Sequence, residues 1–219
     1  MKNFSREDEN VNKRERIKIL LQRLPLLYPD ARCVLEYYGD PEKLLIATIL
    51  SARTTDNAVN RVTPLLWTEV HDIGGLAAAD KGLIEDTVHS LGFFRSKAKS
   101  IRNAAKWLLE NGGLPDTIDG LVHIPGVGRK TANVIIGEIF GKPAIIVDTH
   151  VGRLSGRLDL TRAKQPDKIE TSLRRLVPED QQTSFSHQLG FHGRAVCTSR
   201  NPSCDSCDLV KICPQRGVR

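Results

Sequence analysis

The amino-acid sequence predicts an all-α protein, and three observations point to that fold class. Apolar residues recur with the 3.6-residue period of a helix along most of the 219 positions. Turn residues such as Gly, Pro and Asp separate the periodic stretches at short intervals. The one strand-like run, residues 144–147, is four apolar residues long and fits a buried connector equally well. We therefore expect helices joined by short turns, without internal repeats or low-complexity linkers.

Helix boundaries in the first half of the chain follow from capping residues. Apolar residues at i, i+3, i+4 and i+7 between Ile17 and Leu24 predict the first helix. The segment LLIATIL after Pro41 is apolar on nearly every face, so its helix should be central. The expected boundary residues are Pro25 as the end of the first helix, Asp40, Asp56 and Ser96 as N-caps, and Gly92 as a C′ residue.

The second half of the chain is expected to remain helical. A short helix near residues 117–123 and a longer one over about 129–140 should flank the turn IPGVGRK. Further helices are expected near 149–158, 167–177 and 182–196.

Composition and charge narrow the function classes. Hydrophobic residues make up 40% of the chain and charged residues 26%, which is ordinary for a soluble globular protein. No apolar run approaches the roughly 18 residues of a membrane span, and MKNFSREDENVNKRER is too polar for a signal peptide. We therefore expect a cytoplasmic protein with no membrane association. The net charge of +6 favours an acidic partner such as nucleic acid. Basic residues exceed acids between Gly126 and Arg157 and again from Phe191 onward.

Four of the five cysteines gather near the end of the chain, spaced Cys197-x6-Cys204-x2-Cys207-x5-Cys213. Cytosolic thiols stay reduced, so a metal site is expected in place of two disulfides. Zinc sites normally use two short cysteine pairs, and this array has one; its longer outer gaps suit a four-cysteine iron–sulfur cluster at least as well. The spacing leaves that choice open. Cys33 stands apart and is expected to be a small buried residue.

The stretch IPGVGRKT, residues 124–131, has the composition of a phosphate-binding turn. It does not fit the nucleotide loop G-x-x-x-x-G-K-[ST], because Arg129 precedes Lys130 and Ile124 stands where the first glycine is needed. A helix–hairpin–helix fits better, since free N–H groups at a helix start bind a DNA phosphate without reading bases. An ordinary interhelical turn remains the alternative at this point. The expected DNA-contacting residues of the hairpin are Gly126, Val127, Gly128 and Arg129.

Lys130 and Asp148 form a candidate catalytic pair. A partly desolvated lysine in the first turn of a helix should have a pKa below its ordinary value of about 10.4, and a neutral amine can form a Schiff base. Such a lysine needs a carboxylate to move protons and to stabilise a cationic sugar. Asp148 ends the apolar run 144–147 and is the proposed partner, and it can also cap the helix that follows.

Taken together, these segments resemble the endonuclease III family of DNA glycosylases over roughly residues 14–214. The matching segments are LVHIPGVGRKTANVIIGEIFG, IIVDTHVGRLSGRL and FHGRAVCTSRNPSCDSCDLVKIC, with LLIATILSARTTD and SLGFFRSKAKSI upstream. The resemblance implies two helical domains with a DNA groove between them. A six-helix barrel over 34–141 would contain the hairpin, and an iron–sulfur domain would combine 1–33 with 142–219. The ligands of its [4Fe–4S] cluster would be Cys197, Cys204, Cys207 and Cys213.

The resemblance also implies a reaction. Lys130 would attack C1′ of a flipped nucleotide, displace a damaged pyrimidine and form a Schiff base, and β-elimination at the 3′ phosphate would follow. Asp148 would assist proton transfer and stabilise positive charge. The chain would then be a bifunctional DNA glycosylase and abasic-site lyase that removes oxidised pyrimidines in base excision repair. Its partner would be double-stranded DNA carrying a damaged base or an abasic site, bound by a monomer, at the nucleoid if the source is bacterial.

Three positions depart from the pattern of the family. Arg53 stands where the family usually has Gln, at the position thought to fill the gap left by the flipped base. Phe93 replaces the usual Leu at a position that resembles the wedge into the opposite strand. The loop between Cys197 and Cys204 has Arg200 as its single basic residue, where the family loop is more basic. These three residues are expected to contact DNA, with an altered opposite-base preference and a more salt-sensitive affinity.

Other functions are compatible with parts of the sequence. A mismatch-specific glycosylase has the same fold, but such relatives usually lack the nucleophilic lysine. A DNA-binding, damage-sensing module with weak or lost catalysis would explain Arg53 and the sparse loop. An iron–sulfur redox protein would not need the hairpin with its Lys–Asp pair. Base removal and β-elimination transfer no electron, so they require no redox role of the cluster. His150 and His192 are expected to be structural histidines.

Overall fold

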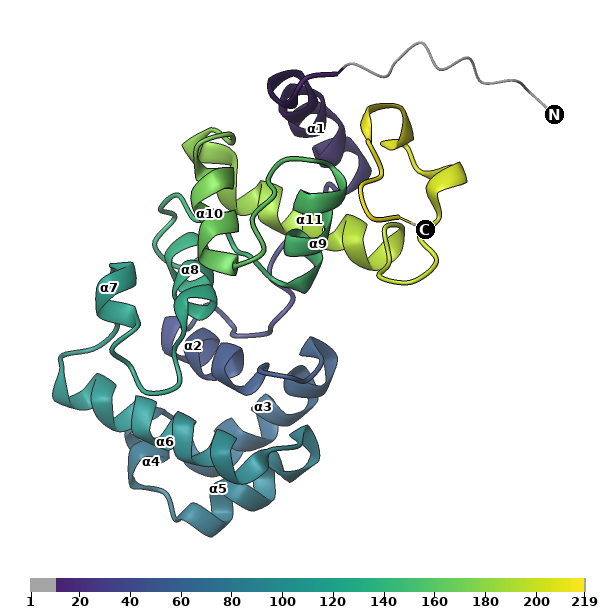
Figure 1. The fold of residues 1–219 in the computed structure, drawn as a ribbon. Coiled ribbons are helices and arrows are strands. Elements are labelled where there is room, and N and C mark those ends of the chain that lie inside the picture. Colours follow the sequence, from purple (N-terminus) through teal and green to yellow (C-terminus); the bar gives the residue numbers. More distant parts are fainter. Residues whose placement is uncertain (1–10, 219) are drawn as a thin grey trace. The chain divides into compact units, whose positions relative to one another are not determined.

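The computed structural model describes residues 11–218, and the chain divides into two compact units (Figure 1). The first, here called the central unit, is the continuous segment Cys33–Gly141. The second, here called the split unit, combines Met1–Arg32 with Lys142–Arg219. Across residues 11–218 the regular elements are α-helices and short 3-10 turns, without a strand, which confirms the all-α prediction.

The central unit is built around one apolar helix. Its elements are α2 Pro41–Leu50, α3 Asp56–Val70, α4 Ile73–Ala78, α5 Lys81–Val88, the 3-10 turn η1 His89–Leu91, α6 Phe94–Glu110, α7 Ile118–Leu121 and α8 Arg129–Glu138. Every residue of α2 from Leu44 to Leu50 is buried, and α2 packs against α3, α6 and α8. The sequence predicted this central place from the lack of a polar face.

The split unit takes helices from both ends of the chain. Its elements are α1 Lys13–Leu27, α9 Thr149–Arg157, α10 Pro166–Arg174, α11 Gln182–Ala195, and the 3-10 turns η2 Glu179–Gln181, η3 Cys204–Ser206 and η4 Val210–Ile212. α11 packs against both α9 and α1, and Phe185 of α11 is fully buried with Leu20 and Leu24 of α1. The apolar stripe predicted between Ile17 and Leu24 is therefore the face that docks the first helix on the last one.

The run 144–147 is a buried connector and not a strand. Its backbone polar groups are satisfied by side chains of α11: the amide of Ile146 donates to Ser186 Oγ at 3.0 Å, and Thr183 Oγ1 donates to the carbonyl of Ala144 at 3.4 Å. A buried backbone group needs such a partner, and here side chains replace a neighbouring strand.

Of the two N-caps predicted for α2 and α3, the first is confirmed and the second is wrong. Asp40 caps α2, since its Oδ1 accepts from the amides of Glu42 and Lys43. Asp56 does not cap α3: Thr55 is the N-cap, and its Oγ1 accepts from the amide of Ala58.

Two further boundaries differ from the prediction. Pro25 does not end α1, which continues to Leu27, because a proline in the last turn removes a single hydrogen bond while Tyr28 N–H still reaches Leu24. α6 begins at Phe94, two residues before the expected cap Ser96, and no side chain caps it. Gly92 follows the 3-10 turn η1 with φ of 67°, so the chain does turn there.

None of the helices within residues 11–218 is long and apolar enough to cross a membrane.

Candidate active site and cysteine cluster

The turn between α7 and α8 is a tight hairpin shaped by glycine. Gly126 has φ of 86°, and a Cβ there would lie 3.0 Å from Cβ of Ser100 on α6. Gly128 is the N-cap of α8 in an extended conformation and offers no side-chain acceptor to the first amides of the helix. Val127 is buried, and its amide donates to the carbonyl of Ile124, so it anchors the turn. The helix start that follows is typical of a phosphate-binding site.

Replacing Gly126 with alanine is expected to destabilise the protein by about 1–2 kcal/mol, because an L-residue resists this backbone conformation and the methyl group presses on Ser100. Gly128→Ala is a matched control, since φ is −99° and nothing lies within 4 Å of the added Cβ. Urea denaturation of the two variants measures the difference. Equal stabilities would contradict the strained-turn interpretation.

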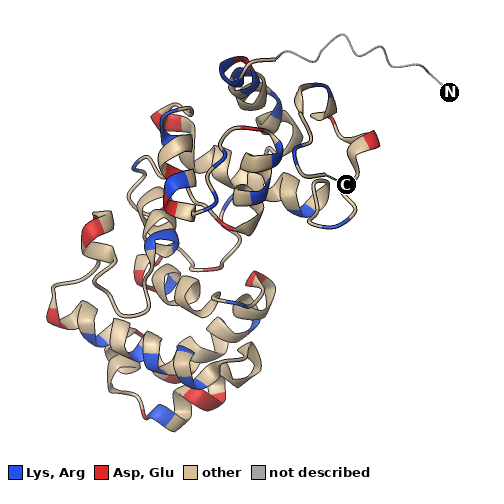
Figure 2. Ribbon diagram, viewed as in Figure 1, with Lys and Arg blue, Asp and Glu red and all other residues tan. Residues whose placement is uncertain are grey.

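Lys130 is the second residue of α8, and its side chain is exposed. The partial desolvation expected from the sequence is therefore absent in the folded chain. Figure 2 shows the basic residues at the start of α8.

Asp148 lies in the split unit, where it is the N-cap of α9. Its Oδ1 accepts from the amide of Val151 at 2.7 Å, so the capping role considered for it is real. Its Oδ2 lies 3.8 Å from Nη2 of Arg194 on α11. Oδ1 of Asp148 therefore caps α9, and Oδ2 forms an ion pair with Arg194. The Asp148 side chain remains partly accessible to solvent.

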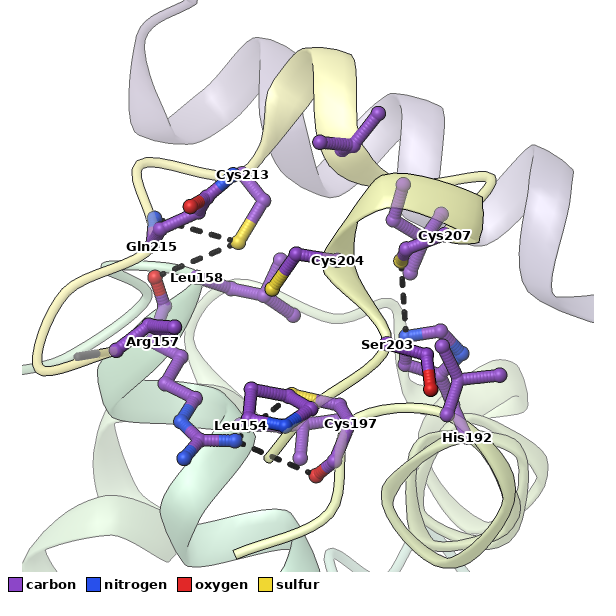
Figure 3. Close-up of a pocket in the computed structure, with 15 residues that line it drawn as sticks. Leu154, Arg157, Leu158, His192, Cys197, Ser203, Cys204, Cys207, Cys213 and Gln215 are labelled. Atoms are coloured by element: carbon purple, nitrogen blue, oxygen red, sulfur yellow. Dashed lines mark hydrogen bonds between the residues drawn. The ribbon is translucent and has the colours of Figure 1, made fainter. Parts of the chain in front are cut away.

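The four clustered cysteines line one pocket of the split unit (Figure 3). All five cysteines of the chain lie within residues 11–218, and none forms a disulfide. Cys197, Cys207 and Cys213 pack against the apolar core of the unit, while Cys204 does not. Leu154, Leu158, Leu209 and Val210 complete much of the pocket wall. A largely apolar wall with four converging thiols is typical of a buried metal centre.

N–H groups point at the sulfurs of this pocket. Nη1 of the buried Arg157 lies 3.2 Å from Cys197 Sγ, and the amide of Gln215 donates to Cys213 Sγ at 3.4 Å. Arg157 also donates to the carbonyls of Thr198 and Ser199, which holds the loop after Cys197. Hydrogen-bond donors aimed at sulfur suit thiolate ligands, because a thiolate is the better acceptor.

His192 is buried beside Cys207, with Nε2 3.5 Å from its Sγ (Figure 3). Its Nδ1 lies 2.8 Å from the hydroxyl of Tyr28, at the end of α1. Burial lowers the pKa of His192, and Asp208 contributes in the opposite direction. The expected structural role of His192 thus includes contact with a cysteine of the cluster.

Cys33 is in the central unit, apart from the other four cysteines. It is half-buried, and burial raises the pKa of its thiol to about 11. A thiol with that pKa stays protonated at neutral pH and is a poor nucleophile and metal ligand. Cys33 is less buried than the sequence predicted.

Arg53 and Phe93 lie side by side in the central unit. Both have the left-handed backbone, with φ of 56° and 47°, and the Arg53 guanidinium is 5.6 Å from the centre of the Phe93 ring. Phe93 is 64% exposed, so it is not a core residue. A strained, exposed aromatic residue beside an arginine is typical of a functional turn.

The turn that presents Phe93 is pinned from inside by Lys97. This lysine on α6 is buried, its Nζ donates to the carbonyl of Leu91 at 2.9 Å, and burial lowers the pKa of its amine. Basic residues also recur along α6 (Figure 2), outside the two basic segments identified from the sequence. Arg200, in the split unit, is exposed in the loop that follows Cys197.

Sequence reasoning missed the residues that surround the site. Arg157 and Lys97 lie in segments that carry the family resemblance but were assigned no role, and Tyr28 lies outside those segments. The contacts of Arg157 and Tyr28 span 40 and 164 residues. A buried Lys or Arg is rare and always needs partners, yet burial itself is not visible in the sequence.

Comparisons with known proteins agree with this site. Residues 46–179 match the family model described as HhH-GPD superfamily base excision DNA repair protein. Endonuclease III of Synechocystis sp. is 46% identical over 206 residues, covering 93% of this chain and 94% of that protein. Endonuclease III of Bacillus subtilis is 38% identical, covering 91% of this chain and 92% of that protein.

Solved structures show the same similarity. A non-covalent endonuclease III–DNA complex is 36% identical, with a TM-score of 0.88 over 94% of this chain and 97% of that one. A trapped covalent endonuclease III–DNA intermediate has the same identity, TM-score and coverage. A thermostable thymine-DNA glycosylase, 21% identical with a TM-score of 0.81, shares the fold. The chain belongs to the endonuclease III family, within the HhH-GPD superfamily of base excision DNA repair proteins.

Proposed function

We propose that this chain, a DNA glycosylase and abasic-site lyase of base excision repair by its family, removes oxidised pyrimidines from double-stranded DNA through a Schiff base on Lys130. The observation that carries the proposal is the placement of Lys130. Its amine is exposed in the first turn of α8, directly after a glycine hairpin suited to hold a DNA phosphate. The trapped covalent endonuclease III–DNA intermediate supports a covalent route.

The reaction follows from the chemistry of an amine and a nucleoside. The neutral amine of Lys130 attacks C1′, and the bond from C1′ to the base breaks, so the base leaves with the bonding electrons and takes up a proton. Opening of the sugar ring gives an imine between Nζ and C1′. Loss of a C2′ proton then breaks the C3′–O bond and releases the 3′ phosphate. The Asp148 carboxylate stabilises the cationic sugar and accepts protons.

DNA contacts are assigned to both units. In the hairpin, Gly126, Gly128 and Arg129 hold the sugar-phosphate chain while Val127 packs beneath it. The exposed Phe93 ring offers a stacking surface for a base, and Arg53 beside it adds a cation that can reach a base edge or a phosphate. Arg200 is the cationic contact of the loop after Cys197. Damaged bases stack poorly, so they cost less to flip out, which contributes to selectivity.

The cofactor assigned to the split unit is a [4Fe–4S] cluster on Cys197, Cys204, Cys207 and Cys213. Among residues 11–218, no three His, Cys, Asp or Glu side chains are arranged around a single metal ion. The four cysteines line one largely apolar pocket, and N–H donors reach two of their sulfurs, which suits thiolate ligands of a cluster. When bound, the cluster cross-links the segment 197–213, and the reaction assigns it no electron transfer.

The test is covalent trapping. Purified protein is incubated with a duplex that contains one abasic site and with borohydride, which reduces an imine to a stable amine. The proposed function predicts a covalent protein–DNA adduct from a monomeric enzyme, as measured by denaturing electrophoresis and by light scattering. Absence of the adduct despite binding of the duplex would overturn the lyase mechanism and favour a damage-sensing module.

Asp148→Asn separates catalysis from capping. Asparagine caps helices as well as aspartate does, so stability should change by less than about 0.5 kcal/mol. Loss of the negative charge should lower the rate of base release by about a hundredfold or more. Asp148→Ala, which also removes the cap, should additionally cost about 1 kcal/mol of stability. Full activity in Asp148→Asn would contradict the catalytic assignment.

A further inference from the structure

Tyr28, His192 and Cys207 form a continuous hydrogen-bonded row inside the split unit. Tyr28 OH lies 2.8 Å from His192 Nδ1, and His192 Nε2 lies 3.5 Å from Cys207 Sγ (Figure 3 shows the second contact). The Tyr28 and His192 rings meet edge to face, with their centres 5.7 Å apart. The geometry joins the end of α1 to a proposed ligand of the cluster.

The ring proton of His192 can be on Nε2 or on Nδ1, and a thiolate at Cys207 favours one of these two tautomers. If Tyr28 donates its hydroxyl proton to Nδ1, the ring proton is on Nε2 and points at Cys207 Sγ. If Nδ1 donates to the Tyr28 oxygen, the lone pair of Nε2 faces the lone pairs of sulfur. The second arrangement is repulsive next to a thiolate that binds iron, so the first is favoured.

We propose that Tyr28 and His192 are positioning residues that hold an N–H donor on the sulfur of Cys207. The proposal rests on the proposed [4Fe–4S] cluster. A hydrogen bond to a ligand sulfur stabilises the more negative, reduced form of a cluster, so it raises the reduction potential. It also strengthens cluster retention, because second-shell partners fix the orientation of a ligand. Tyr28 acts through its hydrogen bond to His192.

The rival explanation is that Tyr28 simply clamps α1 onto the loop of the cysteines. The structure supplies a matched control, because Arg23 on the same helix donates to the carbonyl of Asp208 at 2.7 Å, next to Cys207 in the chain. Removing the Arg23 side chain weakens the attachment of α1 to the cysteine loop and leaves the hydrogen bonds of Tyr28, His192 and Cys207 in place. Tyr28→Phe does the reverse, since it keeps the ring contact and removes the hydroxyl.

The experiment compares holoprotein of the wild type, Tyr28→Phe and Arg23→Ala. Tyr28→Phe should shift the midpoint potential of the cluster to a more negative value, measured by voltammetry, and lose cluster absorption about tenfold faster under a chelator. Arg23→Ala removes an exposed charge but no donor to sulfur, so its shift in potential should be much smaller than that of Tyr28→Phe. In a His192→Gln background, Tyr28→Phe should have no further effect, since its partner is gone.

Each outcome decides the question. An unchanged potential in Tyr28→Phe, or an equal shift in Arg23→Ala, overturns the proposal and reduces Tyr28 to a clamp. A wild-type protein purified with no iron or sulfide overturns the proposed cofactor, and the row then has no cluster to act on. Covalent trapping on abasic DNA is scored separately, so the lyase assignment stands or falls on its own data.

Discussion

Substituting Lys130 with alanine is expected to abolish covalent trapping on abasic-site DNA and to lower strand cleavage by at least about a thousandfold, since the reaction loses its nucleophile. Folding should be unaffected, because the side chain is exposed on the first turn of α8 and alanine is the best helix former. The measurement is single-turnover cleavage of a labelled duplex with and without borohydride. Trapping that persists in Lys130→Ala would assign the Schiff base to another amine.

Lys130→Arg separates nucleophilicity from phosphate binding. Arginine keeps the positive charge at the helix start, but its guanidinium is always protonated and forms no Schiff base. We expect the duplex affinity of Lys130→Arg to stay within about threefold of wild type, while cleavage is lost as in Lys130→Ala. An active Lys130→Arg variant would mean that charge, and not covalent chemistry, is the contribution of this residue.

Replacing Cys204 with serine is expected to remove the proposed cluster and to cost about 3 kcal/mol of stability or more. Cys204 is the informative position, because it is the one cysteine of the four that does not pack against the apolar core of the split unit. A loss of stability there reflects the missing ligand bond and not a core cavity. Iron and sulfide analysis, absorption at about 400 nm and thermal unfolding measure the effect.

Cys33→Ser is the matched control for Cys204. Cys33 belongs to the central unit, and its raised thiol pKa of about 11 keeps it protonated at neutral pH. Iron content and absorption should therefore equal those of the wild type. Full iron content in Cys204→Ser would refute the assignment of four cysteine ligands. Loss of iron in Cys33→Ser would mean that Cys33, in the central unit, is a ligand, which contradicts a cluster confined to the split unit.

Sequence patterns predicted those helix boundaries that depend on residues close together in the chain. Asp40 followed by Pro41 marks a helix start that the structure confirms, because both residues act on amides within three positions. The N-cap of α3 is Thr55 and not the predicted Asp56. Both side chains are suited to capping, so residue type alone does not distinguish between these neighbouring positions. Phe93 in a left-handed conformation had no sequence signal, because this backbone is normally a property of glycine.

The candidate site shows the same division. Lys130 and the four cysteines were found from motif and spacing, and the family match supports the reading of the segments that contain them. The supporting shell was not found, since Arg157, Lys97 and Tyr28 act through contacts that only the folded chain creates. The chemistry proposed for the site rests on residue type and spacing, whereas the groups that surround it are determined by burial in the folded chain.

The split unit has a consequence for the order of events during protein synthesis. Arg16 of α1 is buried, and it donates to the carbonyls of Leu158 and Ile212 at 3.1 and 2.8 Å. These acceptors leave the ribosome roughly 140 and 200 residues after Arg16, whereas the central unit is one continuous segment that can fold as soon as it is made. The apolar face of the first helix therefore stays uncovered until α11 has been made. The contact of Arg16 with Ile212 forms later still, so the docking of α1 is completed only when the cysteine segment has been synthesised, after the central unit can already have folded.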